Sequence, residues 1–213
     1  MKITVFYVGS SLLAPLTKAE GEINRLYGLE LSLATHNCGA PFSEDAWAQA
    51  ERDLNESDIA FIIHVTDDAN AQRIKRALDG GPQSLRAVIA FNCMPSLMRC
   101  ARMGKLEFAS LMKRETGAKR DTEASGRNLL HKLSSWMQDS FKNNAARDNT
   151  ATGDKKRRAN HGQYIKLINR LPRVLKFVPA TGRVADIKHY LNLFCYFLQP
   201  TPGNIRSMLL YAL

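Results

Sequence analysis

The sequence predicts an α/β protein, a three-layer sandwich with a mostly parallel sheet, followed by an α-helical segment. The first observation is an alternation of short apolar runs with longer stretches whose apolar residues recur at three- and four-residue steps. Strands that alternate with helices across short loops are typical of parallel sheets. The second observation is the run at residues 58–65, which is almost continuously apolar, as in a strand covered on both faces.

The first three elements follow from local signals. Residues 2–8 are rich in β-branched and aromatic side chains and end at Gly9, which predicts a buried strand. Residues 16–27 carry apolar side chains at helical spacing and stop at Gly28, a residue type that often ends helices. Residues 29–35 then alternate as a second strand.

The next four elements complete the predicted sheet. Residues 43–54 begin at a serine and place apolar side chains on one helical face. Residues 58–65 form the core strand, residues 67–78 a helix with aspartate near its start, and residues 86–91 a fourth strand. A parallel sheet of four strands joined by helices is the expected result.

Residues 94–106 are predicted as a further helix. On one helical face, Arg99 and Arg102 could approach an anionic ligand, although two solvated surface cations are the favoured interpretation. The three methionines of this segment could line an apolar pocket, and a core role is favoured for them.

The carboxyl ends of the strands are where open sheets of this type bind ligands. We therefore take four residues near these ends as candidate ligand-facing residues: His64, Asn92, Met94 and Arg99. For His64, a hydrogen-bonded position in the core is the favoured alternative. No glycine-rich phosphate-binding motif follows any strand, and no catalytic, cofactor-binding or metal-ligating residue is assigned.

Cysteine and histidine spacing gives no sign of a metal site. The four cysteines form no Cys-x-x-Cys pair, and the five histidines show no metal-ligand spacing. Isolated thiols are mostly buried small apolar residues. Ser10, Ser11 and Cys93 stand at strand ends, where nucleophiles are often found, but no base close in sequence identifies any of them as one.

The chain has 213 residues, 45% of them hydrophobic, and a formal net charge of +10. No apolar run reaches the roughly 18 residues that span a bilayer, and the first residues are too strand-like for a signal peptide, so we expect a cytoplasmic chain. A basic cluster at residues 155–158 could bind nucleic acid or an acidic membrane surface. A solvated loop is favoured, because no aromatic residues are interleaved to stack on bases.

Three segments are predicted along the chain. Residues 1–110 form an α/β head domain, and residues 111–161 contain one helix and a basic flexible linker. Residues 162–213 form a helical segment that begins a larger neck region.

Two helices are expected in that last segment. One runs over residues 184–198 and is ended by the prolines that follow, and a second starts with Asn204 as its cap. Met208, Leu209 and Leu213 lie on one face of the second helix, for which we predict no partner in this chain. We therefore expect these residues to be the beginning of a longer polypeptide.

Two blocks of the sequence resemble a known family. The first is MPSLMRCARMGKL at residues 94–106; the second is LPRVLKFVP at residues 171–179, followed by Asp186, Tyr190, YFL at residues 196–198 and Asn204-Ile205. In this order and at this separation, they resemble the N-terminal region of the large (H) subunit of magnesium chelatase. They are also similar to the related large subunit of cobaltochelatase. Ala180 replaces a family glycine and Phe197 a family tryptophan, which leaves the subtype open.

This resemblance implies a function. The chain would be the N-terminal part of the porphyrin-binding subunit of an ATP-dependent magnesium chelatase, which inserts Mg²⁺ into protoporphyrin IX in chlorophyll or bacteriochlorophyll biosynthesis. Two AAA+-type partner subunits would hydrolyse the ATP, so Mg²⁺ and ATP serve the whole complex. The 213 residues alone are expected to be inactive. In a phototrophic eukaryote the compartment would be the plastid stroma.

Three alternatives remain at this point. The first is a cobaltochelatase large subunit that acts in cobalamin biosynthesis. The second is a stand-alone, non-catalytic α/β ligand-binding module. The third is a nucleic-acid binder, suggested by the charge of +10 alone.

Overall fold

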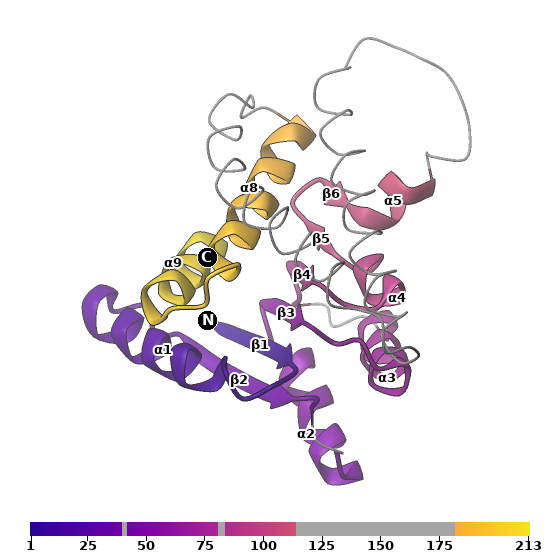
Figure 1. Ribbon diagram of the computed structural model, residues 1–213, viewed down its shortest axis with the longest axis horizontal. Coiled ribbons are helices and arrows are strands. Elements are labelled where there is room, and N and C mark those ends of the chain that lie inside the picture. Colours follow the sequence, from indigo (N-terminus) through magenta and orange to yellow (C-terminus); the bar gives the residue numbers. More distant parts are fainter. Residues whose placement is uncertain (40–41, 81–83, 114–181) are drawn as a thin grey trace, which may run out of the picture.

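The computed structural model describes residues 1–39, 42–80, 84–113 and 182–213 (Figure 1). In these ranges it contains a six-stranded sheet with the order β2-β1-β3-β4-β5-β6. Its four parallel strands are β1 (Lys2–Tyr7), β2 (Ser32–Asn37), β3 (Ile59–Ile63) and β4 (Ala87–Phe91). Every residue of β3 and β4 is buried, as expected for strands covered on both faces. The predicted α/β class with a mostly parallel sheet is confirmed.

Local capping signals set the ends of the first three helices. α1 (Leu13–Tyr27) ends at Gly28, whose φ of 62° is left-handed and therefore suits glycine. Ser43 caps α2 (Glu44–Asn55) by accepting a hydrogen bond from the backbone N–H of Ala46 at 3.2 Å. Asp67 caps α3 (Asp68–Asp79) in the same way through the N–H of Asn70, at 2.8 Å.

The helices cover both faces of the sheet. The chain moves outward from β1 to β2 through α1 and then returns to β3 and β4 through α2 and α3. Because such crossovers are right-handed, α1 lies on one face and α2 and α3 lie on the other. α8 (Gly182–Phe197) and α9 (Pro202–Ala212) lie on the side of α1 (Figure 1). These are the three predicted layers.

The second strand begins later than the sequence predicted. Leu31 exchanges two hydrogen bonds of 2.7 Å with the side-chain amide of Asn24, one through its N–H and one through its carbonyl. These bonds hold the chain after Gly28 in a turn against α1, and β2 starts only at Ser32. The side-chain amide of Asn24 thus satisfies the backbone N–H and carbonyl of Leu31, which would otherwise need hydrogen bonds from a neighbouring strand.

The segment 94–106, predicted as one helix, is different. α4 (Pro95–Met98) ends after four residues, and the chain then forms a hairpin of β5 (Arg102–Met103) and β6 (Leu106–Glu107). β5 pairs with β4 in antiparallel orientation, opposite Val88. The prediction of a shared helical face for Arg99 and Arg102 is therefore wrong, because pairing with the free edge of β4 outweighs the local helical pattern.

The C-terminal helices belong to the same core. The ring of Phe91, the last residue of β4, lies 5.3–5.4 Å from the rings of three α8 residues, Tyr190, Phe194 and Phe197. The buried hydroxyl of Tyr190 donates a hydrogen bond to the backbone carbonyl of Ala90. α8 therefore packs directly on β4.

The apolar face of α9 is not open, contrary to the sequence-based expectation. Met208 and Leu209 are fully buried, whereas Leu213 is 40% exposed. α9 lies along α1, and Arg206 forms an ion pair with Glu22 of α1 at 2.8 Å. The partner that could not be seen in the sequence is thus α1, whose Glu22 lies 184 positions before Arg206.

The cap of α9 also differs from the prediction. Thr201, and not Asn204, is the N-cap, and its hydroxyl accepts a hydrogen bond from the N–H of Asn204 at 3.2 Å. Pro202 occupies the first helical position, where its missing N–H is tolerated.

Several predictions fall outside the described residues. After α5 (Phe108–Lys113), these are the helix and basic linker predicted within residues 114–161 and the first part of the second sequence block, at residues 171–179.

Candidate functional site

The strand order reverses direction between β1 and β3. From β1 the chain goes outward to β2, and it then returns to β3 on the other side of β1. In open α/β sheets, ligands bind outside the carboxyl ends of the strands at such a switch point. We therefore define the switch-point edge as four short segments at the carboxyl ends of β1, β2, β3 and β4: residues 9–11, 37–39, 64–67 and 92–94.

Asn37 joins the first two of these segments. Its side-chain oxygen accepts hydrogen bonds from the backbone N–H of Gly9 at 3.3 Å and of Gly39 at 3.0 Å. Gly9 has a φ of 102°, which other residues rarely adopt. A Cβ on Gly39 would lie 3.1 Å from the Asn37 oxygen, so the close approach leaves little room for a side chain. One amide side chain therefore fixes two loops.

Two further contacts hold the neighbouring segments. The side-chain amide of Asn70, on α3, donates to the carbonyl of Cys38 at 3.2 Å. The N–H of Met94 donates to the carbonyl of Val65 at 2.9 Å, which joins the loops after β3 and β4. The switch-point edge is thus connected by hydrogen bonds from β1 to β4.

His64 lies at this edge with an exposed side chain. It follows β3 and has a φ of 59°, and its ring centroid lies 5.3 Å from that of Phe197 on α8. The protein packed around the ring lowers the pKa of the imidazole by desolvation, although much of the residue stays in contact with solvent. The alternative of a hydrogen-bonded core histidine is wrong. No hydrogen bond of this side chain is seen within the described part of the chain.

Asn92 repeats this geometry on the next strand. It follows β4 with a φ of 52°, so two adjacent strands end in non-glycine residues with left-handed backbone. Such conformations cost free energy and are concentrated at functional sites. The N–H of His64 donates to the carbonyl of Phe91 at 2.9 Å, which places the two residues side by side.

Met94 and Arg99 have different surroundings. Met94 is half-buried at the start of α4 and packs against the core, as do Met98 and Met103, so the predicted core role of the methionines is confirmed. Arg99 is exposed after α4 and lies within electrostatic range of Lys75 on α3. The structure therefore brings His64, Asn92 and Met94 together and leaves Arg99 outside the switch-point edge.

The nucleophile candidates receive no support. Cys93 is buried, its thiol donates to the carbonyls of Ile62 and Phe91 at 3.1 and 3.2 Å, and burial raises its pKa to about 12. Burial likewise raises the pKa of Cys38 to about 12. Ser10 and Ser11 are exposed. The cysteines behave as the sequence predicted, with Cys38 and Cys93 buried and Cys100 and Cys195 half-buried.

Among the described residues, no group of three or more histidine, cysteine, aspartate or glutamate side chains could hold a metal ion. No described helix has the length and apolar character needed to cross a membrane.

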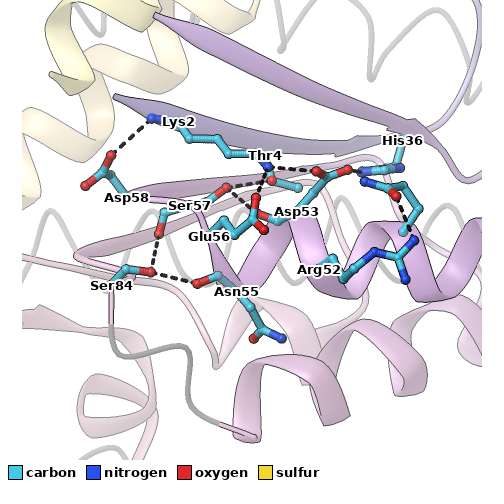
Figure 2. A network of polar contacts seen from close by, with 11 residues as sticks. Lys2, Thr4, His36, Arg52, Asp53, Asn55, Glu56, Ser57, Asp58 and Ser84 are labelled. Atoms are coloured by element: carbon cyan, nitrogen blue, oxygen red, sulfur yellow. Dashed lines mark hydrogen bonds and ion pairs between the residues drawn. The ribbon is translucent and has the colours of Figure 1, made fainter.

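A polar cluster that the sequence did not predict lies between β1, β2 and α2 (Figure 2). The carboxylate of Asp53 accepts from Lys2 Nζ at 2.8 Å and contacts His36 Nε2 at 3.1 Å. Beside it, the hydroxyls of Thr4 and Ser57 are hydrogen-bonded at 2.7 Å. We call Lys2, His36 and Asp53 the buried charge cluster. One signal in the sequence could have indicated this cluster, because the charged Asp53 lies among the apolar residues of the predicted helix.

Burial and charge act on this cluster in opposite directions. Burial lowers the pKa of His36, and the adjacent Asp53 only partly offsets this effect. For Asp53, burial would raise the pKa, but hydrogen bonds from Lys2 and Gln49 and the charge of Lys2 outweigh it, so the pKa is lowered. Hydrogen bonds to Asp53 and Glu56 raise the pKa of Lys2. At neutral pH the cluster therefore contains a carboxylate, an ammonium group and a neutral imidazole.

One family matches this chain. It is described as a domain of unknown function (DUF3479), and the match covers residues 2–191, which include the sheet, the switch-point edge and most of α8. None of the curated proteins matches the sequence.

Proposed function

The chain belongs to the DUF3479 family, and from this premise we propose that it is the N-terminal part of the porphyrin-binding subunit of a magnesium chelatase. That enzyme inserts Mg²⁺ into protoporphyrin IX at the expense of ATP, and two AAA+-type subunits are the proposed partners. In this proposal the chain is a structural and regulatory head of the subunit. It has no assigned role in removing the pyrrole protons or delivering the metal.

The observation that carries the proposal is a contact between the two sequence blocks that resemble the chelatase family. Asp186, from the second block, accepts a hydrogen bond from the N–H of Lys105, from the first block, at 2.8 Å. The same carboxylate lies over Gly104, where a Cβ would approach it to 2.8 Å. Gly104 and Asp186 are thus in direct contact, and this contact joins the first block to the described part of the second.

The family match supports this interpretation. It covers residues 2–191, a range that contains the whole first block and Asp186 and Tyr190 of the second. The hydrogen bond between Lys105 and Asp186 joins positions that are 81 residues apart, so residues of both blocks lie together in the fold.

The experiment is a deletion in the organism that carries the gene. Removing codons 2–191 in frame should abolish or sharply reduce Mg-protoporphyrin formation while leaving cobalamin formation unchanged. Loss of cobalamin alone would instead support the cobaltochelatase assignment. If both products stay at wild-type levels, the chelatase proposal is wrong.

A second experiment tests the isolated chain. Because no residue is assigned to chelation, the 213 residues with deuteroporphyrin, Mg²⁺, ATP and the two motor subunits should form no metalloporphyrin. Clear turnover would show that this chain contains catalytic residues and would contradict the proposed role as a head.

One observation favours a second candidate, a stand-alone, non-catalytic ligand-binding module. Met208 and Leu209 are buried within the chain itself, because α9 packs along α1, and α8 packs on β4. Fluorescence titration with protoporphyrin and with smaller carboxylates separates the two candidates. Saturable binding of a small ligand that His64→Ala weakens, without any binding of protoporphyrin, would favour the module.

A further inference from the structure

The buried charge cluster reaches from Lys2, at the start of β1, to His36, which directly precedes Asn37 at the carboxyl end of β2. Asp53 is the shared partner: one carboxylate oxygen accepts from Lys2 and the other contacts His36 (Figure 2). The side chains of His36 and Asp53 are each only 12% exposed. The cluster connects three elements, because Lys2 belongs to β1, His36 to β2 and Asp53 to α2.

His36 is also the residue before Asn37, which fixes the loops of the edge. His36 and Asn37 are the last two residues of β2, where His36 pairs with Phe6 of β1 and Asn37 pairs with Tyr7. Because His36 and Asn37 are consecutive residues of β2, a displacement of the His36 backbone also displaces Asn37. The hydrogen bonds from Gly9 and Gly39 to the Asn37 side chain would report that movement.

We propose that the buried charge cluster is a proton-sensitive brace, in which protonation of His36 shifts the end of β2 and so alters the Asn37 contacts with Gly9 and Gly39. The inference concerns regulation of the switch-point edge. It does not depend on the identity of the ligand or on the proposed chelatase function.

The charge balance gives the physical reason. With Nε2–H donating to Asp53, the imidazole takes a second proton on Nδ1 and becomes a cation. One buried carboxylate must then serve two cations. Lys2 has a second acceptor, the exposed Glu56, at 2.7 Å, so Asp53 can turn toward His36 while Lys2 keeps a partner. In the proposed protonated state, Asp53 turns toward the imidazolium and Lys2 turns toward Glu56.

The surroundings of His36 are mixed. On α2, His36 contacts Asp53, which is also hydrogen-bonded to Gln49. On β1, the positive charge of Lys2 acts on His36 and lowers its pKa. The ring of Phe6 stacks on it at 5.4 Å, and that of Phe42 lies 6.3 Å away. Since burial lowers the pKa of His36, the transition should occur below the ordinary value of 6.5.

The test is an NMR pH titration of the 213-residue chain from about pH 8 to about pH 5, a range that contains the ordinary histidine pKa. The imidazole signals of His36 and the amide signals of Gly9 and Gly39 are followed together. All three should change with one common midpoint. In His36→Gln, which keeps a side-chain N–H for Asp53 but does not titrate, the glycine signals should stay constant.

Lys2→Met is the second variant, because it removes a charge that lowers the pKa of His36. The His36 midpoint should rise, and the midpoints of Gly9 and Gly39 should rise with it. If the His36 midpoint moves and the glycine midpoints do not, the proposal is wrong, even if His36→Gln fails to fold.

His64→Gln and His189→Gln are the controls. His64 lies at the same edge, and His189 is exposed on α8. Neither substitution should change the glycine titration. Loss of that titration in His64→Gln would assign the effect to the wrong histidine and overturn the proposal, as would glycine signals that remain flat in the wild-type chain.

Discussion

Asp186 is a single side chain that connects α8 to the β5–β6 hairpin. Its carboxylate accepts from the N–H of Lys105 and sits against Gly104, whose φ of 57° is left-handed. Both features require glycine at position 104, one for the backbone angle and one for the space. An α8 residue thus explains why the hairpin turns where it does.

Gly104→Ala should therefore destabilise the protein. The left-handed backbone costs a residue with a Cβ about 1–2 kcal/mol, and displacement of the Asp186 carboxylate adds about 1 kcal/mol for the lost hydrogen bond. Urea unfolding followed by circular dichroism measures the change. Gly21→Ala is the matched control: Gly21 is a helical glycine with open space around its Cα, and alanine there should stabilise by about 0.5–1 kcal/mol. Equal effects of the two variants would contradict this role of Gly104.

The hydroxyl of Tyr190 allows a second test, of a single hydrogen bond between α8 and β4. Its hydroxyl is buried and donates to the carbonyl of Ala90 in β4, so Tyr190→Phe should lower the free energy of unfolding by about 0.5–1.5 kcal/mol. Tyr27, which is 53% exposed on α1, is the control, and Tyr27→Phe should change the stability very little. A stability unchanged by Tyr190→Phe would mean that the hydrogen bond has no net value.

Among the elements, α9 has the clearest tertiary role. It is a short helix, and helices of this length gain most of their stability from packing. Its buried side chains lie along α1, and the ion pair between Arg206 and Glu22 adds a polar contact at the border. α9 therefore depends on α1 for its position.

Leu209→Ala tests this dependence. Removing a fully buried leucine side chain should cost about 2–5 kcal/mol, because the cavity closes only partly. Leu213→Ala, at the 40% exposed end of the same face, should change the stability by less than about 0.5 kcal/mol. Chemical denaturation of both variants gives the comparison. A small effect at Leu209 would show that α9 is not docked in solution.

The whole molecule should lose stability in acid in two steps. The pKa values of His36 and His64 are lowered in the folded state, so the unfolded chain binds more protons once the pH falls through the ordinary value of 6.5. The lowered pKa of Asp53 adds stability that is complete above 3.8 and is lost as the pH falls through its folded-state pKa. The raised pKa of Lys2 acts at the other end, where stability is lost above 10.5.

Unfolding free energies measured between about pH 2 and about pH 11, a range that brackets the ordinary pKa values of aspartate, histidine and lysine, give the profile. In His36→Gln, the unfolding free energy should decrease less steeply just below pH 6.5. The loss of stability above pH 10.5 should be the same as in the wild-type chain. A profile that rises on acidification through this range would contradict the lowered pKa values of both histidines.

The candidate site was only partly predictable. Position after a strand was enough to select His64, Asn92 and Met94, because the carboxyl ends of parallel strands share one edge. The same rule failed for Arg99, which lies beyond the short α4. It also gave no sign of Asn37 as the residue that joins two loops, since this depends on the close approach of Gly9 and Gly39.

The sequence by itself determined the elements whose signals act within a few residues. These include the end of α1 at Gly28, the starts of α2 at Ser43 and of α3 at an aspartate, and the apolar runs of β3 and β4. Capping bonds and apolar periodicity are local, so they can be read in order along the chain.

Only the tertiary structure decided which distant residues meet. The β5–β6 hairpin exists because β4 offers a free edge, and α9 is buried because α1 lies beside it. The buried charge cluster joins Lys2 to Asp53 across 51 positions. A periodic pattern shows that a face will be buried but not against which partner, because packing free energy depends on surface that comes together only when the chain has folded.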